Sequence, residues 1–89
     1  MAMIGMDVEQ VRQLATQFGA KADAINDIIT DITNRLSSTE WKGTDSEQFR
    51  NDWNSNLTTQ LRNVEQALRD AQQKATKNAT DQEQTSSAL

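Results

Sequence analysis

The feature that most constrains this chain is a long row of apolar residues spaced alternately by three and four. The row keeps this heptad spacing over four repeats, and Leu14 and Ile28 widen it on one side. Such spacing is that of one face of an α-helix, and the strict alternation of a strand is missing. The row therefore predicts an amphipathic helix over about residues 7–37. Its members are Val8, Val11, Ala15, Phe18, Ala22, Ile25, Ile29, Ile32 and Leu36.

Polar residues mark both ends of this helix. Asp7 stands at the expected N-cap, and Gln10 follows three residues later, as in a capping box. The chain contains no proline that would break the helix. The run Ser37-Ser38-Thr39 is expected to end it, and residues 38–43 are expected to form a turn.

A second apolar row predicts a second helix over about residues 44–80. Thr44 and Glu47 have the spacing of a capping box with Thr44 at the N-cap. The row begins with steps of four, which drift around an α-helix by about 40° each, before it becomes heptad. We expect the early part to cover the turn as well as the neighbouring helix. The polar residues 81–89 are predicted to be a disordered tail. The apolar positions are Phe49, Trp53, Leu57, Leu61, Val64, Leu68, Ala71 and Ala75.

A short turn between two long helices makes them antiparallel neighbours, so we expect one all-α hairpin domain over residues 1–89. Two helices enclose no interior, and the widened row is too broad for one neighbour to cover. Each large apolar side chain left in water forfeits about 1.5–3 kcal/mol. The sequence therefore predicts a dimer in which two hairpins form a four-helix bundle. The expected core or dimer residues are Val11, Leu14, Phe18, Ile25, Ile28, Ile29, Ile32, Leu57, Leu61, Val64 and Leu68.

The composition argues against other functions. The chain has no His, Cys or Tyr, so we expect no catalytic site, no cofactor and no transition-metal site. The net charge is −4 and the nine basic residues are dispersed, which disfavours nucleic acid as a partner. No apolar run is long enough to span a membrane, and the apolar segment Met1 to Met6 is too short for a signal peptide. We expect the chain to begin in the cytoplasm and any export to need no signal peptide.

The segment Trp41-Lys42-Gly43 lies midway between the two predicted helices. Gly43 can adopt a positive φ without steric cost, which suits a tight reversal. Trp41 offers a large apolar plate that can fold over the end of the hairpin onto Phe49 or Trp53.

With these residues the chain resembles the WXG-type family, the small early-secreted-antigen-like proteins of type VII secretion systems. The resemblance rests on Trp41 and Gly43, on Phe49 at the start of the second helix and on Trp53, and it covers about residues 5–80. It implies a dimeric four-helix bundle that is exported folded through a channel driven by a membrane ATPase. It also implies that Trp41 and Gly43 lie beside the partner's C-terminal tail as an export signal.

The tail departs from the pattern of that family. The family's tail motif is Tyr-x-x-x-Asp or Glu, whereas this chain has no tyrosine and offers only the spacing from Lys77 to Asp81. Either a partner chain supplies the motif, or this member is not exported on its own.

Several roles and partners therefore stay open. We slightly favour a homodimer over a heterodimer with a related WXG-type protein, because the apolar rows carry no obvious feature that restricts pairing, such as a single buried Asn. The resemblance also implies the secretion ATPase as a partner. An alternative is a cytoplasmic adaptor or chaperone-like subunit that escorts a larger effector. A membrane-active amphipathic protein is disfavoured by the acidic polar face.

Overall fold

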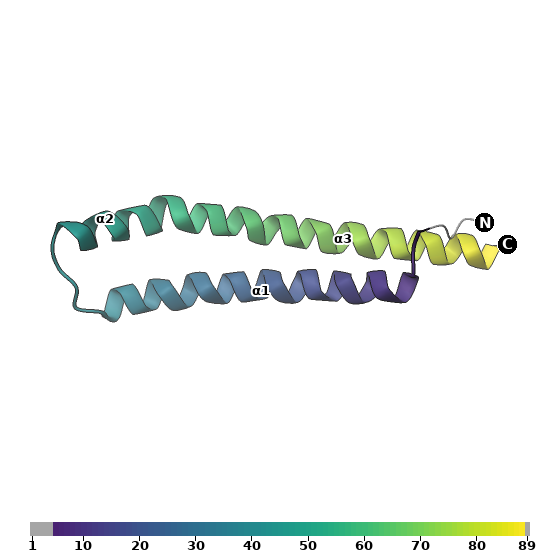
Figure 1. Ribbon diagram of the computed structural model, residues 1–89, viewed down its shortest axis with the longest axis horizontal. Helices are drawn as coiled ribbons and strands as arrows, with labels where there is room; N and C mark the ends of the chain where they lie inside the picture. The colour runs from purple at the N-terminus through teal and green to yellow at the C-terminus, as the bar shows by residue number, and fades with distance from the viewer. Residues whose placement is uncertain (1–4, 89) are drawn as a thin grey trace.

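The protein is an antiparallel pair of long helical rods. The computed structural model describes the backbone of residues 5–88, so residues 1–4 of the apolar N-terminal segment and residue 89 of the expected tail lie outside it. Its elements are α1 (Val8–Ser38), α2 (Thr44–Asp52), the π-helical turn η1 (Trp53–Leu57) and α3 (Thr58–Ala88). The last three follow without a break and form the second rod (Figure 1). The all-α hairpin expected from the two apolar rows is confirmed.

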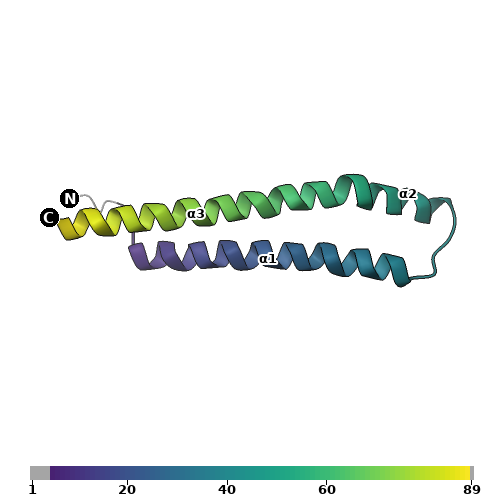
Figure 2. The same ribbon diagram turned by 180° about the vertical axis from the view of Figure 1, so that it is seen from behind.

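The molecule is long and thin, with extents of 67 × 18 × 15 Å. Seen from behind, α3 runs beside most of α1, the C-terminal end of α1 lies beside η1 and α2, and the connecting loop closes one end only (Figure 2). The start of α1 and the end of α3 therefore lie together at the opposite end.

The caps of α1 follow the sequence. Asp7 is the N-cap, and its Oδ1 accepts a hydrogen bond from the backbone N–H of Gln10 at 3.0 Å. At the other end the hydroxyls of Ser38 and Thr39 donate to the carbonyl oxygen of Arg35. Such local bonds compete with the helical ladder, which is why a Ser/Thr run favours a helix end.

The start of α2 differs from the predicted capping box. The N-cap is Gly43, at φ 114°, and no side chain caps the helix. The backbone N–H of Glu47 donates to the carbonyl oxygen of Gly43 at 3.1 Å, so Thr44 is already the first helical residue. The capping-box prediction was wrong by one residue, because Gly43 takes a left-handed conformation that only glycine adopts readily.

One π-helical turn explains the steps of four in the second apolar row. At η1 the backbone N–H of Thr58 donates to the carbonyl oxygen of Trp53, five residues earlier. A π turn holds more residues than an α turn, so side chains four apart keep nearly the same direction. The π turn thus offsets the drift expected from steps of four. Trp53, Leu57 and Leu61 are all buried or half-buried as a result.

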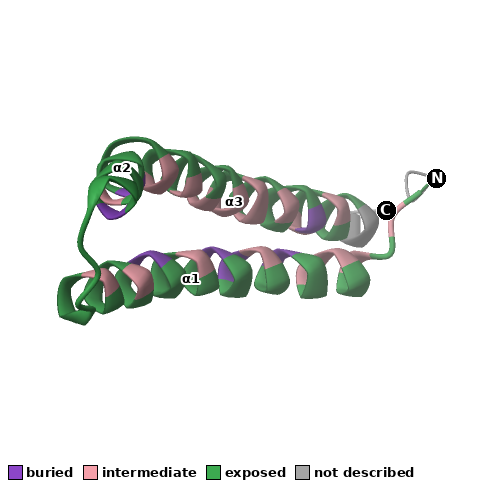
Figure 3. Ribbon diagram, turned by 60° about the vertical axis from the view of Figure 1, so that its left-hand side comes forward, coloured by how far each residue is buried: buried purple, intermediate pink, exposed green. Residues whose placement is uncertain are grey.

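The core is a narrow strip along the facing sides of the two rods, while exposed residues cover the outer surfaces (Figure 3). Its centre consists mainly of small residues, which let the two rods approach closely. A Cβ at Gly19 would lie only 2.7 Å from the side-chain nitrogen of Gln72. The buried residues of the strip are Ala15, Gly19, Ala22, Ile29, Trp53 and Ala79.

α3 continues to Ala88, whereas the sequence reading placed its end near residue 80 and a disordered tail beyond it. No glycine or proline follows Gly43 to stop the helix. Ala79 is fully buried, and Arg12 on α1 donates to Glu83 at 2.8 Å. Contacts to α1 therefore carry the helix past the point where its own apolar residues thin out.

The close approach at Ala22 predicts a sharp size limit. Ala22 has no exposed surface, so Ala22→Leu should lower the free energy of unfolding by about 1–3 kcal/mol through overpacking. The control Ala24→Leu lies on the exposed surface of the same helix and should change it by less than about 0.5 kcal/mol. Urea denaturation followed by circular dichroism measures both, and equal losses would contradict the close approach.

Candidate functional site

The tip of the hairpin is the loop of residues 39–43, which carries Trp41 and Gly43. Gly43 lies at φ 114°, yet nothing stands within 4 Å of a Cβ placed there. The requirement for glycine is therefore conformational and not one of space. Gly43 lets α2 begin at the next residue, Thr44.

Three aromatic side chains form a ladder at the tip, which we call the aromatic ladder: Trp41, Phe49 and Trp53. The ring centroids of Trp41 and Phe49 are 6.0 Å apart, and those of Phe49 and Trp53 are 6.4 Å apart. Both spacings are typical of favourable aromatic pairs. Trp41 contacts Phe49, as its position suggested, but it is 42% exposed, whereas Trp53 is 6% exposed. The rings of Trp41 and Phe49 are therefore accessible to a partner.

Trp53 anchors the ladder to the first rod. Its indole Nε1 donates to the hydroxyl oxygen of Thr33 on α1 at 3.1 Å. A buried indole N–H needs such an acceptor. Sequence reasoning found Trp53 but missed Thr33, which reads as an ordinary polar residue of a helix.

Two further residues of the tip were also missed, Ser46 and Arg50. Ser46 is buried and donates from its hydroxyl to the carbonyl oxygen of Trp41 at 2.7 Å. Arg50 donates to Ser46 and to carbonyl oxygens of the loop and of the end of α1. The one available signal was an arginine about two helical turns after a loop, within reach of the unsatisfied carbonyls that end the preceding helix.

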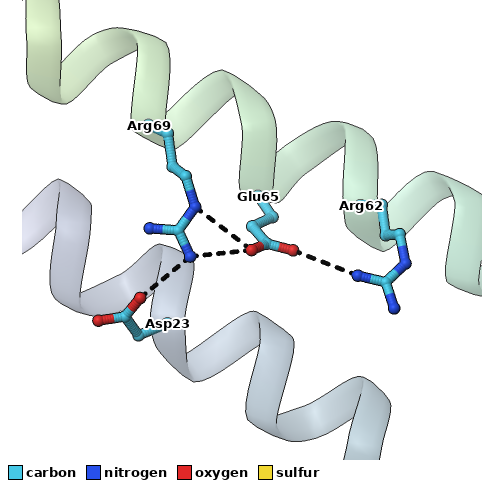
Figure 4. A network of polar contacts seen from close by, with 4 residues as sticks. All are labelled: Asp23, Arg62, Glu65 and Arg69. Atoms are coloured by element: carbon cyan, nitrogen blue, oxygen red, sulfur yellow. Dashed lines mark hydrogen bonds and ion pairs between the residues drawn. The ribbon is translucent and has the colours of Figure 1, made fainter.

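One broad side of the hairpin is polar. Arg69 on α3 donates to Asp23 of α1 at 3.0 Å and to Glu65 at 2.9 Å, and Arg62 lies 3.7 Å from Glu65 (Figure 4). The hydrogen bonds from Arg69 to Glu65 and then to Asp23 raise the pKa of Arg69 above its usual range. Beside this network an open groove runs over Gly19. Surface ion pairs of this kind contribute little to stability but keep this side in water.

The opposite broad side carries exposed large apolar residues, and we call it the apolar side. It carries Leu14, Ile28 and Val64, each about half exposed. Leu14 lies nine residues from Asp23, about two and a half helical turns, and so on the other side of α1. Val64 lies about 1.4 turns from Arg69 on α3, again away from the polar network.

The other predicted core or dimer residues lie between the two rods or along the edge of the apolar side. Val64 sits at the edge because Glu65, whose side chain is 15% exposed, takes the inward position next to it. The half-buried residues of this set are Val11, Phe18, Ile25, Ile32, Leu57, Leu61 and Leu68, and Ile29 is buried.

These surfaces suit contact with other chains. Within residues 5–88, His, Cys, Asp and Glu side chains form no group of three that could hold a metal ion. None of the helices described is both long enough and apolar enough to cross a bilayer.

Comparison with known proteins agrees with the tip geometry. Residues 3–87 match the family WXG100, described as proteins of 100 residues with WXG. No curated protein and no solved structure is significantly similar to the chain. The match covers almost the full length, and Trp41 and Gly43 supply the tryptophan and glycine of the family's motif. The chain therefore belongs to the WXG100 family, the early-secreted-antigen-like family of type VII secretion.

Proposed function

We propose that this protein is a type VII secretion substrate or interaction module that works as a dimer of helical hairpins, exported folded or escorting a partner. The family is secreted by type VII systems, its members generally pair with related chains, and it is not a family of enzymes. The observation that carries the proposal is the one-sided exposure of large apolar residues on a rod that is polar on its other side.

The apolar side is the dimer surface in this proposal. Leu14, Ile28 and Val64 are each about half exposed in the single chain. A second hairpin laid on this side would cover them, and each fully covered side chain contributes about 1.5–3 kcal/mol. A second copy of this chain can cover these residues, because a two-fold axis places the same surface of both chains in contact. The polar side is unsuitable, since covering the Asp23–Arg69 pair would remove two charges from water.

The tip is the recognition surface in this proposal. Trp41 and Phe49 present exposed rings, and within residues 5–85, whose side chains are described, the indole N–H of Trp41 meets no acceptor. A partner can therefore gain both apolar contact and one hydrogen bond there. By family resemblance, that partner is the tail of the second chain together with the secretion ATPase.

The missing tyrosine favours a second candidate, an adaptor that stays with a larger effector. The chain contains no tyrosine, and at the matching spacing Lys77 and Asp81 pair with each other at 2.6 Å. Residues 1–89 thus supply no such motif to either chain of a homodimer. A related partner chain or an effector with its own helical hairpin would supply it, and the protein would then serve as escort.

The dimer surface predicts a change in self-association. Ile28→Glu should raise the dimer dissociation constant about a hundredfold or more, because it replaces apolar contact of about 1.5–3 kcal/mol by a charge. The control Thr30→Glu adds the same charge two residues away, on the polar side of α1, and should leave the constant nearly unchanged. Analytical ultracentrifugation measures both. A wild-type chain that is a well-folded monomer at micromolar concentration would refute the dimer.

The tip predicts a loss of export. Trp41→Ala should reduce the protein in the culture supernatant to the level of a strain without the secretion ATPase, while the dimer still forms. Because Trp41 is 42% exposed in the single chain, its loss should cost less than the about 3–5 kcal/mol typical of a buried tryptophan.

The export assay has a matched control at the same end of the rod. Glu40→Ala changes a neighbouring side chain that is 86% exposed and should leave secretion unchanged. Immunoblots of cells and supernatants measure all three proteins. Normal secretion of Trp41→Ala would refute the recognition surface, and wild-type protein confined to the cells in both strains would favour the adaptor.

A further inference from the structure

The guanidinium of Arg50 binds main-chain carbonyl oxygens of the last turn of α1 and of the tip loop. Its Nη1 donates to the carbonyl oxygen of Leu36 in the last turn of α1. Its Nη2 donates to that of Thr39 at 3.2 Å and, at a longer 3.5 Å, to that of Trp41. Carbonyls at a helix C-terminus have no partner within the helix, so Arg50 satisfies acceptors that α1 cannot.

Ser46 extends this arrangement to the residue that carries the motif. Arg50 Nε donates to Ser46 Oγ at 2.9 Å, and Ser46 Oγ donates onward to the carbonyl oxygen of Trp41 at 2.7 Å. The carbonyl of Trp41 therefore accepts from both side chains. Because Ser46 is buried, its hydroxyl has little access to competing water.

The described surroundings of Arg50 offer its guanidinium no competing ion pair. Among residues 5–88 no carboxylate forms an ion pair with it. Its charge lies at the C-terminal end of α1, where the helix dipole favours a cation. Nothing in the described chain therefore draws Arg50 away from the carbonyls.

The loop has few other restraints. Apart from the bonds within helices, the one backbone-to-backbone hydrogen bond recorded at this end runs from Glu47 to Gly43. The ring contact with Phe49 holds the Trp41 side chain but leaves the main chain of the loop free to turn. The side-chain bonds of Arg50 and Ser46 supply the missing main-chain restraint.

We infer that Arg50, with Ser46 as its relay, is a positioning residue for Trp41: it clamps the tip loop so that the tryptophan is presented on Phe49 in the orientation that a partner recognises. The second half of this inference rests on the proposed function of the tip. An arginine is required because its planar fork donates in several fixed directions at once, whereas lysine offers one compact charge.

The clamp can be measured without any export assay, because Lys42 lies in the loop. Endoproteinase Lys-C cleaves after lysine, so nicking at Lys42–Gly43 in the folded protein reports opening of the loop. Cleavage at Lys21–Ala22, inside α1, reports unfolding of the rod. Mass spectrometry of the fragments separates the two rates.

We expect Arg50→Gln to speed cleavage at Lys42–Gly43 by about tenfold or more relative to that at Lys21–Ala22, because hydrogen bonds from a charged group are lost. Ser46→Ala should give a smaller increase, and Arg50→Lys an intermediate one. The matched control Arg35→Gln removes an exposed cation of α1 that pairs with Asp31 and should leave the ratio unchanged. An unchanged ratio in Arg50→Gln would overturn the clamp.

Secretion of the same variants tests the positioning role. If the inference is right, Arg50→Gln is secreted as poorly as Trp41→Ala although it sediments as a dimer, and Arg35→Gln is secreted normally. A loosened loop with normal secretion, while Trp41→Ala is blocked, would overturn the positioning role. If Trp41→Ala itself is secreted normally, the recognition surface of the proposed function fails, and the cleavage ratio alone still decides whether the clamp exists.

Discussion

Everything in this molecule depends on how little of a helix one neighbouring helix can cover. The two rods meet along Ala15, Gly19 and Ala22, whose small side chains allow a close approach. Leu14, Ile28 and Val64 each stand one position beside a residue that faces the other rod, so they point to the side and stay about half exposed. The thin core and the exposed apolar side therefore have one cause, and a small domain with so little buried surface gains much from a partner.

Much of this arrangement could be predicted from the sequence, because it follows from periodicity. The heptad row located α1 and its inward face, and Asp7 located its first cap. The second helix begins at Thr44 as expected, but its N-cap was misplaced by one residue, since Gly43 and Thr44 are both good N-cap residues and only the path of the loop decides between them. The π turn was also beyond reach, because in a regular α-helix the same steps of four predict a drifting row.

At the tip, too, some residues could be predicted from the sequence and others could not. Trp41, Gly43 and Phe49 could be singled out because a glycine and large rings are rare in this chain and conspicuous at a turn. Ser46 and Arg50 could not, because their partners are main-chain carbonyl oxygens, which every residue possesses. A sequence pattern can indicate side chains that bind one another, because both partners have a recognisable type. It cannot indicate which side chain binds a main-chain carbonyl, because that depends on the conformation of the loop.

The hydrogen bonds at the tip also give a reason why a hairpin of this kind would be exported in the folded state. Arg50 needs the carbonyl of Leu36 on the first rod, and Trp53 needs the hydroxyl of Thr33 there. Both bonds join the two rods, so neither exists in an extended chain or in an open hairpin. The presented Trp41 surface is consequently a property of the closed hairpin and not of a linear peptide. A transport system that recognises such a surface selects folded protein at the moment of binding, which is what the proposed export of a folded dimer requires.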